Sequence, residues 1–135
     1  MIQSGPTVCV VDDDPSVCKA LGRLIKSAGF NVKTYGSAQK FLDDDHTKEP
    51  NLLVLDVRMP GMTGLDLQNH LAASGRAIPI VFITAHENGM AKTTAMAAGA
   101  VAFFQKPFDE KDLLGAIYKA LDLNNTQLGQ AGIED

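Results

Sequence analysis

The stretch Leu52-Leu53-Val54-Leu55-Asp56 decides how this chain folds and where its chemistry collects. Four consecutive apolar residues fit a strand buried on both faces of a parallel sheet. The run ends in a carboxylate, and Val57-Arg58-Met59-Pro60-Gly61 follows at once. Because ligands bind at the carboxyl ends of strands in open α/β sheets, Asp56 is predicted to lie on the rim where function is found.

Three other strand-like runs also end in chemically capable residues. The pairs are Val8 to Val11 with Asp12-Asp13-Asp14, Ile80 to Ile83 with Thr84, and Val101 to Phe104 with Lys106-Pro107. Parallel strands bring such ends to one edge of the sheet. We therefore expect an acidic cluster, a lone carboxylate, a hydroxyl and an ammonium group to meet there.

Length and composition indicate one ordinary globular domain. The chain has 135 residues, of which 45% are apolar and 21% are charged. Cys9 and Cys18 are expected to be buried free thiols in a reducing cytoplasm. No apolar run approaches the roughly 20 residues that cross a bilayer, and the first six residues lack a signal-peptide pattern. A net charge of −4 without a basic stripe argues against direct nucleic-acid binding by this segment.

Strand and helix signals alternate along the chain. Strands are expected at 7–11, 31–35, 52–56, 79–84 and 100–105, and helices at 15–28, from Ser37 to about 42, at 64–74, 88–98 and 109–123. This alternation predicts a flavodoxin-like, doubly wound α/β fold, with a five-stranded parallel sheet in the order 2-1-3-4-5 and five helices. Strands one, three and four should lie in the middle. Residues 1–6 form a lead, 7–123 the domain, and 124–135 a linker or disordered tail.

The acidic cluster argues for a divalent cation. Carboxylates that are forced together repel one another unless they are protonated or neutralised. Oxygen ligands in a loop-lined cleft suit Mg²⁺, or Mn²⁺, which keeps waters that a phosphate can replace. We expect Asp12 and Asp13 to serve as ligands, whereas Asp14 has the alternative role of capping the helix that begins at Pro15.

Asp56 then has two possible roles, as a third ligand or as a nucleophile that forms an aspartyl phosphate. Lys106 would neutralise one phosphoryl oxygen, and the Thr84 hydroxyl would contact another. Each partner also has a simpler interpretation. Thr84 could cap the next helix, and Lys106 could be a surface lysine.

The combination resembles the response-regulator receiver domain of two-component signalling, over about residues 5–123. The matching pieces are Val10-Val11-Asp12-Asp13-Asp14-Pro15, Leu55 to Gly64, Ile83-Thr84-Ala85 and Lys106-Pro107-Phe108. The resemblance implies that Asp56 is the phosphoacceptor and that Asp12, Asp13 and the Arg58 carbonyl join it at the metal. It also implies that Thr84 and Lys106 contact the phosphoryl group, and that the bond before Pro107 is cis.

The resemblance also implies a function. Such domains take a phosphoryl group from a histidine kinase, or slowly from small donors, and catalyse only their own phosphorylation and dephosphorylation, so the chain is not expected to be an enzyme in the usual sense. Asp56 to Gly64, Gly99-Ala100-Val101 and Lys-Pro-Phe are similar to FixJ-like receivers. Those receivers precede a DNA-binding domain, which implies the receiver part of a transcriptional response regulator. The alternative is a stand-alone receiver or a phosphorelay intermediate.

Signal output is expected on one face. Phe103 lies three residues before Lys106, the position of the family's switch aromatic, and Thr84 is the expected switch hydroxyl. The helix at 88–98 carries few large apolar groups, so it can move, and the face around it is expected to become a homodimer surface. Arg58 and His86 flank the site and are expected to tune the rate of phosphoryl hydrolysis.

Three other classes fit less well. An aspartyl-nucleophile phosphatase usually carries a second aspartate two residues after the nucleophile, where this chain has Arg58. A flavin-binding electron carrier needs a hydroxyl-rich phosphate loop after its first strand, and three aspartates there would repel a phosphate. A degenerate receiver that only docks would lack Asp56 or Lys106.

Overall fold

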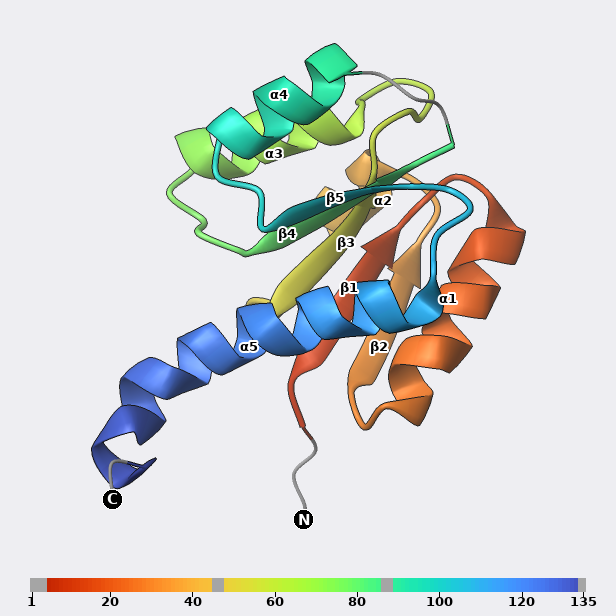
Figure 1. The fold of residues 1–135 in the computed structure, drawn as a ribbon. Helices are drawn as coiled ribbons and strands as arrows, with labels where there is room; N and C mark the ends of the chain where they lie inside the picture. Colours follow the sequence, from red (N-terminus) through yellow and green to blue (C-terminus); the bar gives the residue numbers. More distant parts are fainter. Residues whose placement is uncertain (1–4, 45–47, 86–88, 134–135) are drawn as a thin grey trace.

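The computed structural model of the chain describes residues 5–44, 48–85 and 89–133 (Figure 1). The strands are β1 (Thr7–Val11), β2 (Asn31–Tyr35), β3 (Leu52–Asp56), β4 (Ile80–Thr84) and β5 (Ala102–Gln105). The helices are α1 (Pro15–Ser27), α2 (Ala38–Asp43), α3 (Gly64–Ala73), α4 (Gly89–Ala97) and α5 (Glu110–Ile133). Strands and helices alternate throughout, as the sequence predicts.

The five strands form one parallel sheet in the order β2-β1-β3-β4-β5. The three strands with near-continuous apolar runs, β1, β3 and β4, occupy its middle. β3 is buried along its whole length, whereas the edge strand β2 is exposed or half-buried at every position. The predicted fold class and strand order are therefore confirmed.

Each face of the sheet is covered by its own set of helices, because alternate strand residues point to opposite faces. On one face, Cys9, Val11, Leu53 and Leu55 pack with buried residues of α2, α3 and α4. On the other, side chains of α1 and α5 cover Val8, Val10, Leu52 and Val54. Figure 1 shows this arrangement, with α1 and α5 on one side and α3 and α4 on the other.

Side-chain caps fix where the helices begin near the functional edge. The Asp14 carboxylate accepts a hydrogen bond from the Ser16 N–H over 2.8 Å, so Asp14 caps α1 in the role that the sequence left open. Thr63 and Asp66 form a reciprocal capping box at the start of α3. The point where the loop after β3 enters α3 is therefore fixed by side-chain hydrogen bonds.

Two expectations about the C-terminal third need adjustment. α5 continues to Ile133, ten residues beyond its expected end at Leu123, because the polar segment after it contains no proline to stop a helix. The expected strand at 100–105 begins only at Ala102, since Ala100 closes α4 instead. That 124–135 is a linker or disordered tail remains a prediction. Within the described residues, the helices all fall short of the length and apolar character needed to span a membrane.

Candidate functional site

Three carboxylates meet at the edge where β1 and β3 end. One oxygen from each of Asp12, Asp13 and Asp56 lies within 4.8 Å of the others. Asp12 is 1% exposed and Asp56 is 5% exposed, whereas Asp13 faces solvent. The strand order predicts this meeting, because β1 and β3 are neighbours at the point where the chain reverses its winding direction.

Asp12 is held by contacts to its main chain and to both carboxylate oxygens. Its Oδ1 accepts a hydrogen bond from the Asp14 N–H over 2.9 Å, and its Oδ2 pairs with the Lys106 ammonium over 2.9 Å. The Cys18 thiol donates to the Asp12 carbonyl oxygen over 3.2 Å. Cys9 and Cys18 are both free and buried, as predicted. Lys106 is thus part of the site and not a solvated surface lysine.

The backbone after Asp56 is fixed by close packing against α3. The Gly64 N–H donates to the Val57 carbonyl oxygen over 2.9 Å. A Cβ atom on Gly64 would lie 2.2 Å from the Asp56 carbonyl oxygen, so only glycine fits here. Met59, 6% exposed, anchors the loop in the core, and the Arg58 N–H donates to Asp56 Oδ1 over 3.3 Å.

The surroundings of Asp56 favour its neutral form. Burial, and after it the negative charge of Asp12, raises the pKa of the Asp56 carboxyl from 3.8 to about 7. The Lys106 ammonium and the Arg58 N–H act in the opposite direction. A carboxyl group must be charged to bind a cation or to attack phosphorus. A positive group placed beside Asp56 would lower its pKa again and favour that charged form.

Thr84 and Lys106 reach the same edge from β4 and from the loop after β5. Thr84 ends β4 and is 2% exposed, and its carbonyl oxygen accepts a hydrogen bond from the Lys106 N–H over 2.7 Å. The Lys106–Pro107 peptide bond is cis, as the resemblance implies. A cavity of about 300 Å³ opens over the site, and it is lined by Asp12, Asp13, Asp14, Asp56, Arg58, Ala85 and Lys106.

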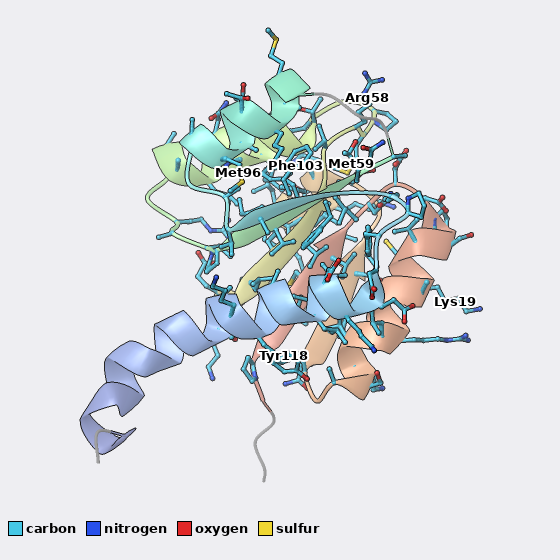
Figure 2. All side chains as sticks on the ribbon, viewed as in Figure 1. Lys19, Arg58, Met59, Met96, Phe103 and Tyr118 are labelled. Atoms are coloured by element: carbon cyan, nitrogen blue, oxygen red, sulfur yellow. The ribbon has the colours of Figure 1, made fainter. Side chains whose placement is uncertain are left out.

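Arg58 is one of the two residues expected to tune the rate of phosphoryl hydrolysis. Arg58 is exposed at the rim of the cavity, and Figure 2 shows its side chain pointing away from the body of the protein. His86 lies outside the described residues.

Phe103 and Phe104 point to opposite faces of the sheet, as alternation on a strand requires. Phe103 is half-buried and packs with the α3 and α4 side of the core, with its ring 6.0 Å from that of Phe82. Phe104 packs on the α1 and α5 side, beside Phe108. Phe103 is therefore the aromatic residue of this pair that lies on the α4 face (Figure 2).

Several residues that shape the site were not singled out from the sequence. Gly64 and Met59 position the Asp56 loop, and Cys18 holds the Asp12 backbone. Away from the site, Gln68 of α3 is buried against α4 and was not singled out either. Gln68 had a readable signal, because it is a polar residue in register with Leu67 and Leu71 on the apolar stripe. The close approach of Gly64 to Asp56 depends on tertiary packing and has no such signal.

Comparison with known proteins agrees with this geometry. A family model described as "Response regulator receiver domain" matches residues 8–118, most of the chain. The chain belongs to the response-regulator receiver family. As a member of that family it is a signalling domain of two-component systems, and its relatives include FixJ, as the FixJ-like motifs predict.

Three relatives illustrate the similarity. The response regulator protein TmoT of Ectopseudomonas mendocina is 49% identical over 116 residues, which are 86% of this chain and 53% of TmoT. The transcriptional regulatory protein FixJ of Azorhizobium caulinodans is 37% identical over 84% of this chain and 54% of its own length. The solved structure of the response regulator StyR is 48% identical with a TM-score of 0.83, covering 96% of this chain and 66% of StyR. The chain thus spans about half the length of the curated relatives it matches.

Proposed function

We propose that this domain accepts a phosphoryl group on Asp56 from a histidine kinase and that the modification switches an output face. The observation that carries the proposal is the position of Asp56, which is buried at the end of a central strand within 4.8 Å of two further carboxylates. Lys106 completes the site from the opposite side. Charge neutralisation and positioning are what phosphoryl transfer mainly requires.

The donor set fits Mg²⁺ or Mn²⁺. Hard carboxylate oxygens of Asp12, Asp13 and Asp56, with the Arg58 carbonyl as a further ligand, are the kind these ions prefer. Bound there, the ion would neutralise the carboxylates and the charge of the incoming phosphoryl group. The raised pKa of Asp56 supports such a site, because an adjacent cation would restore the charged form.

The reaction is an in-line displacement. A carboxylate oxygen of Asp56 forms a bond to phosphorus as the bond from phosphorus to the donor nitrogen breaks, and the electron pair leaves with the donor. The Lys106 ammonium, paired with Asp12 before transfer, moves to a phosphoryl oxygen, where it works as a compact positive charge. The Thr84 hydroxyl contacts another phosphoryl oxygen. Water later attacks phosphorus, the bond from phosphorus to the Asp56 oxygen breaks, and the electron pair returns to the Asp56 carboxylate as inorganic phosphate leaves.

The phosphoryl signal leaves through the face built by α4, β5 and α5. Thr84 moves toward the phosphoryl group, Phe103 turns inward, and the remodelled face pairs with a second copy of the domain. The names of relatives such as the transcriptional regulatory protein FixJ support a transcriptional output. We propose that the domain works in the cytoplasm, where a kinase would supply the phosphoryl group. A stand-alone receiver or a phosphorelay intermediate is the less favoured alternative.

Arg58 and His86 are proposed to govern how long the phosphoryl group persists. Both flank the site in sequence, and a bulky polar side chain over the cavity would screen or orient the hydrolytic water. The lifetime of the phosphorylated form of an Arg58→Ala, His86→Ala double variant tests this proposal. An unchanged lifetime would reject the role for both residues.

Acetyl phosphate tests the central function without the kinase. Purified protein is incubated with acetyl phosphate and Mg²⁺, and intact mass is followed over time for wild type and for Asp56→Asn. We expect one phosphoryl group on wild type, none on Asp56→Asn, and none on wild type after chelation of the metal. Equal modification of Asp56→Asn would refute Asp56 as the acceptor.

A further inference from the structure

Gln68 is a buried polar residue that the phosphoryl site does not use. It lies in α3 on the stripe of Leu67 and Leu71, and it is 5% exposed. A buried amide costs free energy unless it is hydrogen bonded. Its Nε2 donates to the main-chain carbonyl oxygen of Ala95 in α4 over 3.1 Å, in a buried bond. A side chain of α3 therefore holds the backbone of α4.

This bond meets α4 at its C-terminal end, where the backbone is already closed. The Ala95 carbonyl oxygen also accepts the Ala100 N–H over 3.1 Å, and the Gly99 N–H donates to the Met96 carbonyl oxygen over 3.0 Å. Gly99 has a φ of 101°, the left-handed conformation that such a helix end requires. Gln68 thus bonds to the same carbonyl that closes the helix.

The rest of α4 is held lightly. Of its nine residues, Ala91 and Ala95 are buried, and alanine contributes little apolar area. Its two large apolar side chains are both exposed, Met90 to 80% and Met96 to 40%. A helix with so little buried apolar surface can change position at small cost.

A surface pocket borders the bond. A cavity of about 360 Å³ lies where the C-terminal ends of α3 and α4 meet the start of β4. Gln68, Ala98 and Gly99 are among the residues that line it. Because α4 buries only two alanine side chains, the hydrogen bond from Gln68 carries a large share of the attachment of α4.

We propose that Gln68 is the pivot of α4. It fixes the C-terminal end of the helix to α3, so that a rearrangement at Thr84 displaces the N-terminal end of α4 while residues 98–100 stay in place. Gln68 is a positioning residue, because it acts through the α4 backbone and not on the phosphoryl group. This inference rests on the proposed function, since the pivot matters only if a signal reaches Thr84.

Amide exchange of the unmodified protein tests the attachment. The Ala98, Gly99 and Ala100 N–H groups report on the C-terminal end of α4, because all three are hydrogen bonded there. Gln68→Met keeps the side-chain length but removes the donor, and the exposed neighbour Asn69→Met is the control. Loss of one buried hydrogen bond should speed exchange at 98–100 about fivefold, with β3 unchanged and no effect of Asn69→Met. Gln68→Leu serves if Gln68→Met does not fold. If a folded Gln68 variant exchanges the amides at 98–100 at the wild-type rate, the inferred attachment of α4 by Gln68 is overturned.

Beryllofluoride with Mg²⁺ then tests the pivot, using exchange in the same segments. In wild type we expect altered exchange at 89–94 and unchanged exchange at 98–100, whereas in Gln68→Met both segments should respond. If exchange in wild type changes as much at 98–100 as at 89–94, the pivot is overturned, but the proposed function is not. A wild type that does not respond anywhere, and so matches Asp56→Asn, contradicts the proposed function and the pivot with it, although the attachment result would stand.

Discussion

At the scale of single residues, the surroundings that suit Asp56 to the proposed phosphoryl transfer also destabilise its charged form. Its folded pKa of about 7 lies above the unfolded value of 3.8. A carboxyl with a raised pKa binds its proton more tightly in the folded state, so its contribution to stability is complete below about pH 4 and is lost as the pH rises toward 7. The metal-free protein should therefore carry an electrostatic cost at neutral pH that a cation relieves.

Asp56→Asn should remove this cost. A displacement of one pKa unit corresponds to about 1.4 kcal/mol. We therefore expect the free energy of unfolding of Asp56→Asn, relative to that of wild type, to be higher at pH 8 than at pH 4 by on the order of 2 to 4 kcal/mol. Urea unfolding of both proteins in chelator at the two pH values measures the difference. Equal effects of the substitution at both pH values would contradict the raised pKa.

Gly64→Ala should damage the site from the far side of the loop. The added Cβ, 2.2 Å from the Asp56 carbonyl oxygen, forces the backbone apart, and we expect a loss of about 1 to 3 kcal/mol in stability together with slower phosphorylation. Gly115→Ala is the matched control, because that helical glycine has open space around its Cβ position. It should gain roughly 0.5 to 1 kcal/mol. Thermal unfolding and acetyl phosphate kinetics of both variants decide the matter.

Asp56 and Gly64 differ in whether their role in the site can be predicted from the sequence. Asp56 is predictable because an apolar run ends in a carboxylate, and parallel strands bring such ends together. Gly64 is one glycine among many, and its contact with Asp56 exists only once α3 packs behind the loop. Gln68 lies between these cases, because its register was readable but its partner Ala95 was not.

At the scale of elements, α1 and α4 differ in how strongly they are attached. α1 buries Cys18, Leu21 and Ile25, whereas α4 buries two alanines. Element type and order follow from periodicity, and so does the light anchoring of α4. The extent of α5 did not follow, because a polar segment without periodicity gives no helix-stop signal at Leu123.

Native-state amide exchange should rank the two helices. We expect amides in α4 to exchange at least about tenfold faster than those in α1, since a helix that buries less apolar area opens at lower free energy. Exchange is followed by mass spectrometry on the unmodified protein. Equal protection of α1 and α4 would show that α4 is attached by more than its alanines and Gln68.

At the scale of the whole molecule, the large apolar side chains that stay exposed lie on α4 and α5. Among the described residues, the exposed large apolar side chains are Met90 and Met96 of α4 and Tyr118 of α5, whereas α1 contributes none. Exposed methionines on a movable helix suit a surface that changes partners. These exposed side chains support the proposal that the dimer surface is built from α4, β5 and α5.

Met96→Glu should weaken the phosphorylation-dependent dimer without affecting phosphorylation. A charge at this 40% exposed position should cost about 1.4 kcal/mol or more, a tenfold weaker association. Sizing chromatography with beryllofluoride and Mg²⁺ compares it with Lys26→Glu, an exposed change on α1. Equal dimerisation of wild type and Met96→Glu would place the interface elsewhere.

Chemical trapping of the phosphorylated residue tests the central claim most directly. After incubation with acetyl phosphate and Mg²⁺, borohydride reduces an acyl phosphate to the alcohol, and peptide mass spectrometry then locates the converted residue. We predict conversion of Asp56 to homoserine in the peptide that contains Leu52 to Arg58, with Asp12 and Asp13 unchanged. Conversion of another carboxylate, or of none while the protein carries a phosphoryl group, would contradict Asp56 as the phosphoacceptor.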